Sequence, residues 1–224
     1  LVLMFAIMAS GYNVMLGWPN LLVFCPAALA VVGGVVSSLL AIEMGLPFIL
    51  TLLIGGVVAA LVGGAVSAGA IVIGSNFEII IATLAFEFVV FYALSSWELV
   101  GPTGISGMPD PSLGALVFTS QIEVYVFLLV ALTGVTFLVA AFDSSLSGTL
   151  SIATGEDEDL LRAIGYNPAT YKLISVVLGA FILGIGGGIY AHVNGLITPG
   201  AFTLDRTVLL LVITVLGGLR TVYG

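Results

Sequence analysis

The sequence predicts an all-α protein that crosses a membrane many times, as its composition, hydropathy and apolar run lengths indicate. Of its 224 residues, 60% are hydrophobic and 7% are charged, whereas a soluble domain carries about 25% charged residues. The mean hydropathy is +1.30. Several apolar runs reach roughly 20 residues, which is the length that a helix needs to cross a bilayer. These runs are too long for barrel strands, which would alternate over about ten residues.

Turn signals divide the apolar runs into about seven predicted spans, of which the first and the last are incomplete. The spans lie near 1–16, 21–42, 47–70, 77–97, 120–142, 172–193 and 207–219. The two longest connectors are 98–119, which is rich in Gly and Pro, and 143–171, which holds a run of acids. Because the chain begins inside one apolar run and stops just after another, we expect a single transmembrane domain, 1–224, truncated at both ends.

The basic residues predict the orientation of these spans. All four lie in the last third of the chain: Arg162, Lys172, Arg206 and Arg220. Cytoplasmic loops of membrane proteins carry an excess of Lys and Arg, so we expect connector 143–171 to be cytoplasmic. Alternation then puts connector 98–119 on the extracytoplasmic side and leaves only Arg206 outside. The predicted location is the cell membrane, as a multi-pass protein.

Small residues recur at helical spacing in the predicted spans. Ala180, Gly184 and Gly188 follow one another every four residues, and so do Ala59, Gly63 and Ser67. Such stripes let helix backbones approach closely in a membrane, where no hydrophobic effect operates between helices. We therefore expect a tightly packed bundle in the lipid bilayer.

One polar, amphipathic helix is predicted in the otherwise apolar chain, within 154–165. Four consecutive acids at 156–159 suit the positive end of a helix dipole. Thr154 is the expected N-cap, with Asp157 three residues later in a variant of the capping box.

The apolar side chains of this helix predict a docking face. Leu160, Leu161 and Ile164, at i, i+1 and i+4, are expected to share one face. Gly165 is expected to end the helix in the left-handed conformation, and Pro168 to prevent its continuation. The alternatives are a helix that docks a partner, or a surface helix resting on the membrane or on its own bundle.

The sequence lacks the motifs of several enzyme classes, and we predict no catalytic residue, metal site or cofactor. The only lysine, Lys172, follows no glycine-rich turn, so there is no Walker A motif. The chain cannot bind ATP by that route, so any energy that it uses must come from a partner or from a gradient. The single histidine, His192, lacks the further ligands that a metal site needs. A basic footprint for nucleic acid is also absent.

Glu87 is the predicted intramembrane carboxylate. It lies about ten residues into its span, which is close to the middle of the bilayer at 1.5 Å of rise per residue. A carboxylate at this depth is costly and faces the bundle interior, a partner or water. We interpret Glu87 as a candidate pathway or gating residue. The alternative is a protonated carboxyl group that is hydrogen-bonded within the bundle or across an interface with another subunit.

From 143 to 224 the sequence resembles the permease subunits of ABC importers for branched-chain amino acids, the LivM/LivH-like family. Residues 158–165 fit the family's EAA-type cytoplasmic loop, in which a glutamate and two small residues precede a glycine. Further resemblances lie at 11–17, 82–86, 101–107, 180–192, 195–199 and 216–219. The chain departs from the family pattern at Leu160 and Leu161, where alanines are usual, at Thr149 and Gly155, where arginines are common, and at Arg220, where a glycine is usual.

The resemblance implies a non-enzymatic permease subunit for branched-chain or related amino acids, with 156–165 as its coupling helix. The residues implied in ATPase coupling are Glu158, Leu160, Leu161, Ala163, Ile164 and Gly165. The implied partners are a second permease subunit, two cytoplasmic ATP-binding subunits and an extracytoplasmic solute-binding protein. Urea or short amides remain an alternative substrate. A secondary transporter coupled to protons through Glu87, or a scaffold without transport, are alternative functions.

Overall fold

The computed structural model describes residues 1–224 except 74–75, 110, 114–115, 118–119 and 222–224, and the chain is mainly helical. Seven helices correspond to the predicted spans: α1 (Val2–Gly17), α2 (Pro26–Glu43), α3 (Phe48–Ile73), α4 (Asn76–Ser96), α5 (Gln121–Asp143), α8 (Pro168–Asn194) and α9 (Leu204–Gly217). Within the described residues, six helical segments are long and apolar enough to cross a membrane, and α1 is shorter at 16 residues. The all-α, polytopic fold class is confirmed, and the predicted number of spans agrees approximately.

Two predicted helix starts were wrong, and a proline marks the true start in each case. α2 begins at Pro26 rather than at 21, and α8 begins at Pro168 rather than at 172. Proline suits the first helical position, where its missing N–H would have no partner in any case. The Asn167 side chain also caps α8, accepting a hydrogen bond from the backbone N–H of Ala169 at 3.1 Å. Pro168 therefore starts a helix.

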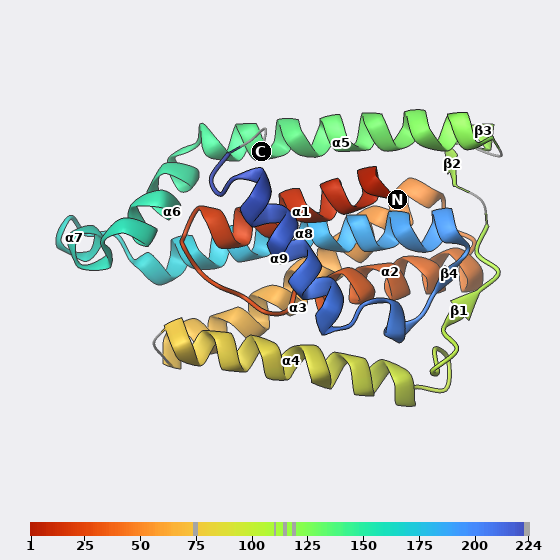
Figure 1. The fold of residues 1–224 in the computed structure, drawn as a ribbon, viewed down its shortest axis with the longest axis horizontal. Coiled ribbons are helices and arrows are strands. Elements are labelled where there is room, and N and C mark those ends of the chain that lie inside the picture. Colours follow the sequence, from red (N-terminus) through yellow and green to blue (C-terminus); the bar gives the residue numbers. More distant parts are fainter. Residues whose placement is uncertain (74–75, 110, 114–115, 118–119, 222–224) are drawn as a thin grey trace.

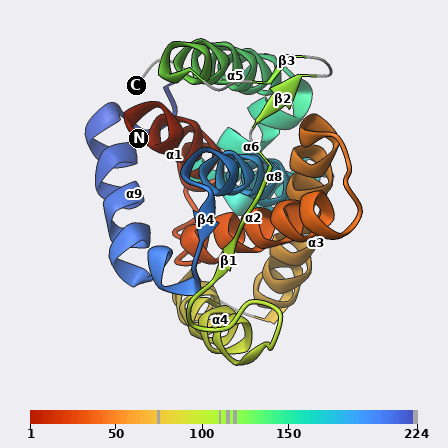
Figure 2. The ribbon, with the colours of Figure 1, turned by 90° about the vertical axis from the view of Figure 1, so that its right-hand side faces the viewer.

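Helix α8 lies in the middle of the bundle, packed against α1, α2 and α3 (Figure 2). α5 runs along one side of the bundle and α4 along the opposite side, while α9 crosses it obliquely (Figure 1). Burial follows this arrangement: the apolar window of α8 is 61% buried, against 17% for α5. Most of the α5 surface therefore faces lipid or another chain.

The predicted small-residue stripes are helix contacts. A Cβ atom at Gly63 of α3 would lie 2.9 Å from the Cβ of Ala180 on α8. One at Gly184 of α8 would lie 2.6 Å from the Cβ of Ala59 and 2.9 Å from the Cα of Gly56, both on α3. These separations are shorter than real Cβ contacts, so side chains larger than those present would push α3 and α8 apart.

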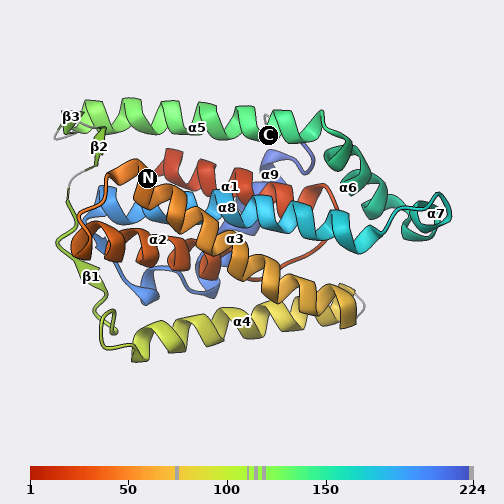
Figure 3. The same ribbon diagram turned by 180° about the vertical axis from the view of Figure 1, so that it is seen from behind.

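The two ends of the bundle differ. At one end, β1 (Ile105–Ser106) pairs antiparallel with β4 (Leu196–Ile197) beyond the end of α8, and β2 (Ser112–Leu113) pairs with β3 (Leu116–Val117). A short 3₁₀ helix, Pro199–Ala201, follows β4. At the opposite end, α6 (Leu146–Glu156) and α7 (Glu158–Ala163) protrude from the bundle (Figure 3).

The basic residues are distributed unevenly between these ends. Arg162 of α7, Lys172 of α8 and Arg220 after α9 all pair with acids of segment 156–159 at the protruding end. Arg206 lies on the first turn of α9, away from that end, with its guanidinium carbon 5.5 Å from the centre of the Phe5 ring. The positive charge of the described chain is therefore concentrated on one side of the bundle.

Candidate functional site

The protruding segment contains two helices, and its N-cap differs from the one predicted. Thr154 lies inside α6, where its hydroxyl donates to the carbonyl of Leu150 at 2.8 Å, so its prediction as an N-cap was wrong. The N-cap of α7 is Asp157, whose Oδ1 accepts from the backbone N–H groups of Asp159 at 3.0 Å and Leu160 at 2.9 Å. Ser145 caps α6 further upstream, so Thr154 already lies in a helix interior, where threonine bonds to the preceding turn.

The apolar residues of α7 point in two directions. Leu160 and Ile164 are 62% and 61% exposed, whereas Leu161 is 2% exposed. The prediction that all three share one exposed face was therefore wrong for Leu161. Residues four apart lie on one helix face, while the next residue is turned by about 100°. Leu161 thus packs inward and anchors α7, while Leu160, Ile164 and the exposed Ala163 form its outer surface.

Ion pairs join α7 to the centre of the bundle. The buried Lys172 of α8 pairs with Oε1 of Glu158 at 2.5 Å, and Arg162 pairs with the other oxygen of Glu158 at 2.9 Å and with Asp159 at 2.8 Å. Gly165 ends the segment with φ 92°, as predicted, and its N–H donates to the Arg162 carbonyl at 3.0 Å. Since Lys172 would otherwise be a buried unpaired charge, Glu158 holds α7 in a defined position on α8.

Polar contacts also hold α6 to the bundle. The Ser175 hydroxyl of α8 donates to Oγ of Ser151 at 3.0 Å. Ser151 Oγ donates to the carbonyl of Ser147 at 2.7 Å and also lies 3.2 Å from the carbonyl of Tyr171. Next to α6, the buried indole N–H of Trp18 donates to the carboxylate of Asp143 at 3.0 Å. The 143–171 connector is therefore attached at several points, so a force on α7 would reach α8 and α1.

Arg220 connects this connector to α1. One of its guanidinium nitrogens lies 3.4 Å from Oε1 of Glu156, its Nε donates to the Gly17 carbonyl at 2.8 Å, and its backbone N–H donates to Oδ1 of Asn13 at 3.3 Å. Its φ is 62°, in the left-handed region that side chains other than glycine rarely adopt. The position is therefore one at which a glycine would fit without strain.

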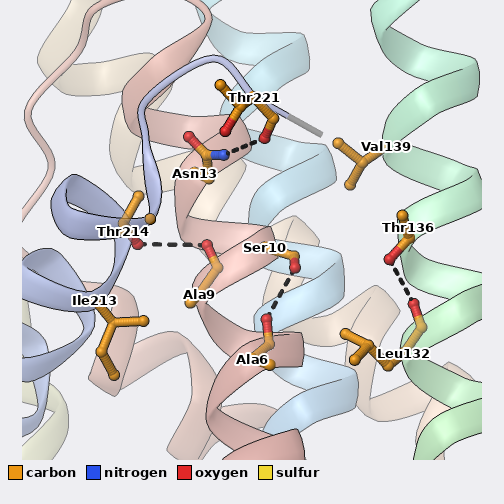
Figure 4. Close-up of a pocket in the computed structure, with 11 residues that line it drawn as sticks. Ala6, Ala9, Ser10, Asn13, Leu132, Thr136, Val139, Ile213, Thr214 and Thr221 are labelled. Atoms are coloured by element: carbon orange, nitrogen blue, oxygen red, sulfur yellow. Dashed lines mark hydrogen bonds between the residues drawn. The ribbon is translucent and has the colours of Figure 1, made fainter. Parts of the chain in front are cut away.

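Asn13 also lines a pocket of about 420 Å³ between α1, α5 and α9 (Figure 4). Its polar lining comprises Ser10, Asn13, Thr136, Thr214 and Thr221, and its apolar lining comprises Ala6, Ala9, Leu132, Val139, Ile213 and Gly217. The volume falls within the range of roughly 300–1,000 Å³ usual for small-molecule sites. The pocket runs along α1 toward the end of the bundle where α6 and α7 protrude, and Thr221 borders it there.

Glu87, a residue of α4, lies beside the buried N-terminus of α2. It is not among the residues that line this pocket. The hydroxyl of Thr207 donates to Oε2 of Glu87 at 2.7 Å and accepts from the backbone N–H of Ala27 at 3.3 Å. Thr83, one turn before Glu87, accepts from the N–H of Phe24 at 3.0 Å. Because α2 begins within the bundle, its free N–H groups need partners there, and side chains of α4 and α9 provide them.

The described residues hold no group of three or more His, Cys, Asp or Glu side chains suited to a metal ion. Nδ1 of His192 lies 2.9 Å from the Gly188 carbonyl, and its ring meets Phe48 edge-on at 4.9 Å between centroids. Cys25 is a buried free thiol.

Sequence reasoning did not find the pocket or the contacts of Arg220. The signal that was available is a set of polar side chains within apolar runs: Ser10 and Asn13, three apart on α1, and Thr136 on α5. Such residues in a membrane span usually turn toward a partner or a cavity. The sequence does not show that α1, α5 and α9 bring them together.

The fold defines the class of this protein: an all-α, multi-pass membrane protein. The whole chain, residues 1–224, matches the family described as "Branched-chain amino acid transport system / permease component", and it belongs to that family. The predicted family is therefore confirmed.

Two curated relatives align with the entire chain at 28% identity over 249 residues. Both are named "High-affinity branched-chain amino acid transport system permease protein LivM", one from Escherichia coli (strain K12) and one from Salmonella typhimurium (strain LT2). The chain spans 58% of the length of each relative. No solved structure matches the chain.

Proposed function

We propose that this chain is the membrane-spanning permease part of an ABC importer for branched-chain or related amino acids, driven by ATPases on separate subunits. The observation that carries the proposal is α7, which exposes Leu160 and Ile164 while Leu161 and Glu158 anchor it. Two large exposed apolar side chains on a short, anchored helix favour burial by a partner, at roughly 1.5–3 kcal/mol each. Family membership supports the same conclusion.

In this proposal α7 is the coupling helix, and its residues divide into two roles. Leu160, Ala163 and Ile164 contact the ATPase, while Glu158 and Leu161 keep α7 attached to the bundle and Gly165 ends it. Movement of the ATPase would shift α7 as a unit. The ion pair of Glu158 with Lys172 would transmit this movement to the central helix α8. That route supplies the mechanical link needed for alternating access.

The proposed assembly has a second permease subunit, two cytoplasmic ATP-binding subunits and an extracytoplasmic solute-binding protein. Connector 143–171 lies in the cytoplasm and connector 98–119 outside, in the cell membrane. The three basic residues at the α7 end support this orientation. Residues 1–224 serve as one transmembrane permease domain.

Glu87 has a supporting role in this proposal. Its hydrogen bond with Thr207 ties α4 and α9 to the start of α2, in the bundle interior. The carboxylate thereby keeps the entry into α2 in position while solute passes elsewhere. This assignment follows the alternative interpretation of Glu87 as a carboxyl group hydrogen-bonded within the bundle, and the interpretation as a pathway or gating group stays a prediction.

Uptake into proteoliposomes tests the function. The full-length protein is reconstituted with its ATP-binding subunits and second permease subunit, and radiolabelled leucine is supplied with the binding protein. Accumulation is expected only with ATP, and leucine, isoleucine and valine should compete while urea and acetamide should not. Accumulation that follows an imposed pH gradient in vesicles lacking the ATPase would overturn the proposal.

Cysteine labelling tests the orientation. The native Cys25 is 0% exposed, so a new surface cysteine can be read against a low background. Leu160→Cys should react with a membrane-impermeant maleimide in inside-out vesicles and not in intact cells. Leu99→Cys, in the connector on the other side, should react in intact cells. The reverse pattern would put α7 outside and exclude docking of a cytoplasmic ATPase.

A further inference from the structure

Helix α6 meets the connector between α1 and α2 at Gly155, in its last turn. A Cβ atom at Gly155 would lie 2.9 Å from the carbonyl carbon of Pro19, 3.1 Å from the backbone nitrogen of Asn20 and 3.0 Å from the Cβ of Asn20. Such separations are as short as or shorter than those that real Cβ atoms show, and two of the neighbours are backbone atoms, which cannot move aside cheaply. Gly155 therefore lets the backbone of α6 rest directly on residues 19–20.

This connector, residues 18–25, is buried along most of its length, which is unusual for a loop. It leaves the end of α1 nearest to α6 and returns into the bundle (Figure 1). Four of its side chains are 0% exposed: Trp18, Leu21, Val23 and Cys25. In a membrane protein, irregular backbone is tolerated where protein covers it and satisfies its polar groups. The connector is therefore an integral part of the bundle interior.

Side chains of two helices bind the backbone of the connector just before α2 begins. The hydroxyl of Tyr12 on α1 donates to the carbonyl of Val23 at 2.8 Å. The backbone N–H of Phe24 donates to the hydroxyl of Thr83 on α4 at 3.0 Å. Because the connector is buried and held at these points, it has little slack. A displacement applied where α6 rests on it should therefore reach the start of α2.

Helix α2, which follows the connector, packs closely on α8. A Cβ atom at Gly34 of α2 would lie 2.8 Å from the carbonyl oxygen of Gly187 on α8, and one at Gly187 would lie 2.6 Å from the carbonyl carbon of Ala30 on α2. With backbones in such close contact, we expect α2 and α8 to move together. At the other contact, α7 holds α8 through the ion pair of Glu158 with Lys172. The protruding segment α6–α7 thus reaches the α2–α8 pair at two separate places.

We propose that Gly155 is a positioning residue for coupling, through which α6 transmits movement to α2 by way of connector 18–25. This inference rests on the proposed function and adds a residue and a second route to it. With the ion pair of Lys172 alone, α7 could pivot about one point as the ATPase moves. A second contact at Gly155 obliges the α2–α8 pair to follow a tilt of the segment as well as a shift.

Gly155→Leu in the transporter, assembled with its ATP-binding subunits in proteoliposomes, tests this role. The added side chain should push the connector away from α6, while the exposed Leu160 and Ile164 of α7 are unchanged. We expect the ATP-binding subunit to co-purify and ATP to be hydrolysed, but leucine uptake per ATP hydrolysed should fall severalfold. Gly69→Leu on α3 is the matched control, because a Cβ atom at Gly69 meets no atom within 4 Å. It should keep the stoichiometry of the unmodified protein.

The proposal is wrong if Gly155→Leu transports leucine with unchanged stoichiometry, or if Gly69→Leu loses as much coupling. Loss of the ATP-binding subunit from the Gly155→Leu complex would also overturn it, since the residue would then act in docking rather than in transmission.

A reversible cross-link gives an answer even where Gly155→Leu assembles poorly. The Cβ atoms of residues 20 and 155 would lie 3.0 Å apart, near the roughly 3.5–4.5 Å of a disulfide. Asn20→Cys combined with Gly155→Cys should therefore form a disulfide on oxidation, and the native Cys25 is buried. If α6 and the connector move as one, the oxidised protein should be as well coupled as the unmodified one. Failure to form the disulfide, or uptake that stops on oxidation and returns on reduction, would reject a fixed contact.

Failure of this inference can be told apart from failure of the proposed function. If the unmodified transporter takes up leucine with ATP and Gly155→Leu behaves like it, only the role of Gly155 fails. If the unmodified transporter shows no ATP-driven leucine uptake, the importer proposal itself fails, and the role of Gly155 in coupling fails with it.

Discussion

The backbone N–H of Arg220 donates to the side-chain oxygen of Asn13 at 3.3 Å, joining two residues that are 207 positions apart in the chain. The amide nitrogen of Asn13 donates in turn to the carbonyl of Thr221 at 3.0 Å. The Arg220 side chain reaches Gly17 and Glu156. Arg220, which follows α9 in the chain, thus contacts both the wall of the pocket and the segment that leads into α7.

Arg220→Gly should separate coupling from stability. The change relieves a left-handed φ of 62° and removes a partly exposed ion pair and one hydrogen bond. These opposing effects are about 1 kcal/mol each, so the thermal midpoint should change little. Leucine uptake per ATP hydrolysed should fall severalfold, measured by parallel uptake and phosphate release in proteoliposomes.

Arg220→Ala is the companion variant. It loses the same side-chain contacts but keeps the unfavourable φ, so it should show the same loss of coupling and lower stability by about 1 kcal/mol. If either variant transports leucine with the stoichiometry of the unmodified protein, the contact between Arg220 and Glu156 has no part in coupling.

The two faces of α7 should respond differently to an added charge. Leu160→Asp and Ile164→Asp alter side chains that are 62% and 61% exposed, so stability should change by about 0.5 kcal/mol or less. Leu161→Asp buries a carboxylate where Leu161 is 2% exposed and should cost about 3 kcal/mol or more. Thermal unfolding in detergent measures the stability of all three variants.

Co-purification of the ATP-binding subunit completes this comparison. The two exposed variants should fold but retain little ATPase, because a charge then lies in the docking surface. Ala169→Asp, on the first turn of α8, adds the same charge beside α7 and should keep its ATPase. Full retention of ATPase by both Leu160→Asp and Ile164→Asp would rule out α7 as the docking helix.

Thr207→Val should destabilise the entry into α2. The variant keeps the shape of Thr207 but leaves Glu87 and the Ala27 N–H without their shared partner. Unsatisfied buried polar groups cost about 1–3 kcal/mol each, and a lower thermal midpoint would show this loss. Thr133→Val, which removes only a bond within its own helix, should have a much smaller effect.

Glu87→Gln distinguishes support from proton coupling. Glutamine retains an oxygen that can accept from Thr207, so ATP-driven leucine uptake should persist at a rate within about twofold of the unmodified protein. Uptake rates at fixed ATP, measured at several pH values, check this prediction. Abolished uptake in a variant that folds and assembles normally would return Glu87 to the transport pathway.

Gly187→Ala should disrupt the contact of α8 with α2. A Cβ atom at Gly187 would overlap the carbonyl oxygen of Ala30 and lie 2.6 Å from its carbonyl carbon. Backbone atoms cannot move aside cheaply, so we expect a loss of about 1–3 kcal/mol or more in unfolding experiments. Gly134→Ala on α5 meets no atom within 4 Å and should raise stability by about 0.5–1 kcal/mol. Equal effects of the two substitutions would contradict close packing of α2 on α8.

Local pattern was sufficient to predict several features of this protein. Apolar run length predicted the helices, because a span must satisfy its own backbone and face lipid or other apolar helices. The small residues at 59, 63, 180 and 184 predicted a helix contact, and Gly165 predicted the end of α7. Each of these features depends on residues a few positions apart in the chain or on solvation of the helix by the bilayer, and a sequence shows both.

Tertiary structure decided what depends on neighbours distant in sequence. Local rules predicted Thr154 as the cap and one shared face for Leu160, Leu161 and Ile164. Both predictions failed, because α6 continues through Thr154 and Leu161 packs inward. The buried start of α2 at Pro26 exists because Thr83 and Thr207 supply partners from α4 and α9. The contacts of Arg220 and the pocket between α1, α5 and α9 arise only when these helices meet. Hydrogen bonding and close packing join residues that are distant in sequence, and the hydropathy of the chain does not show which residues these are.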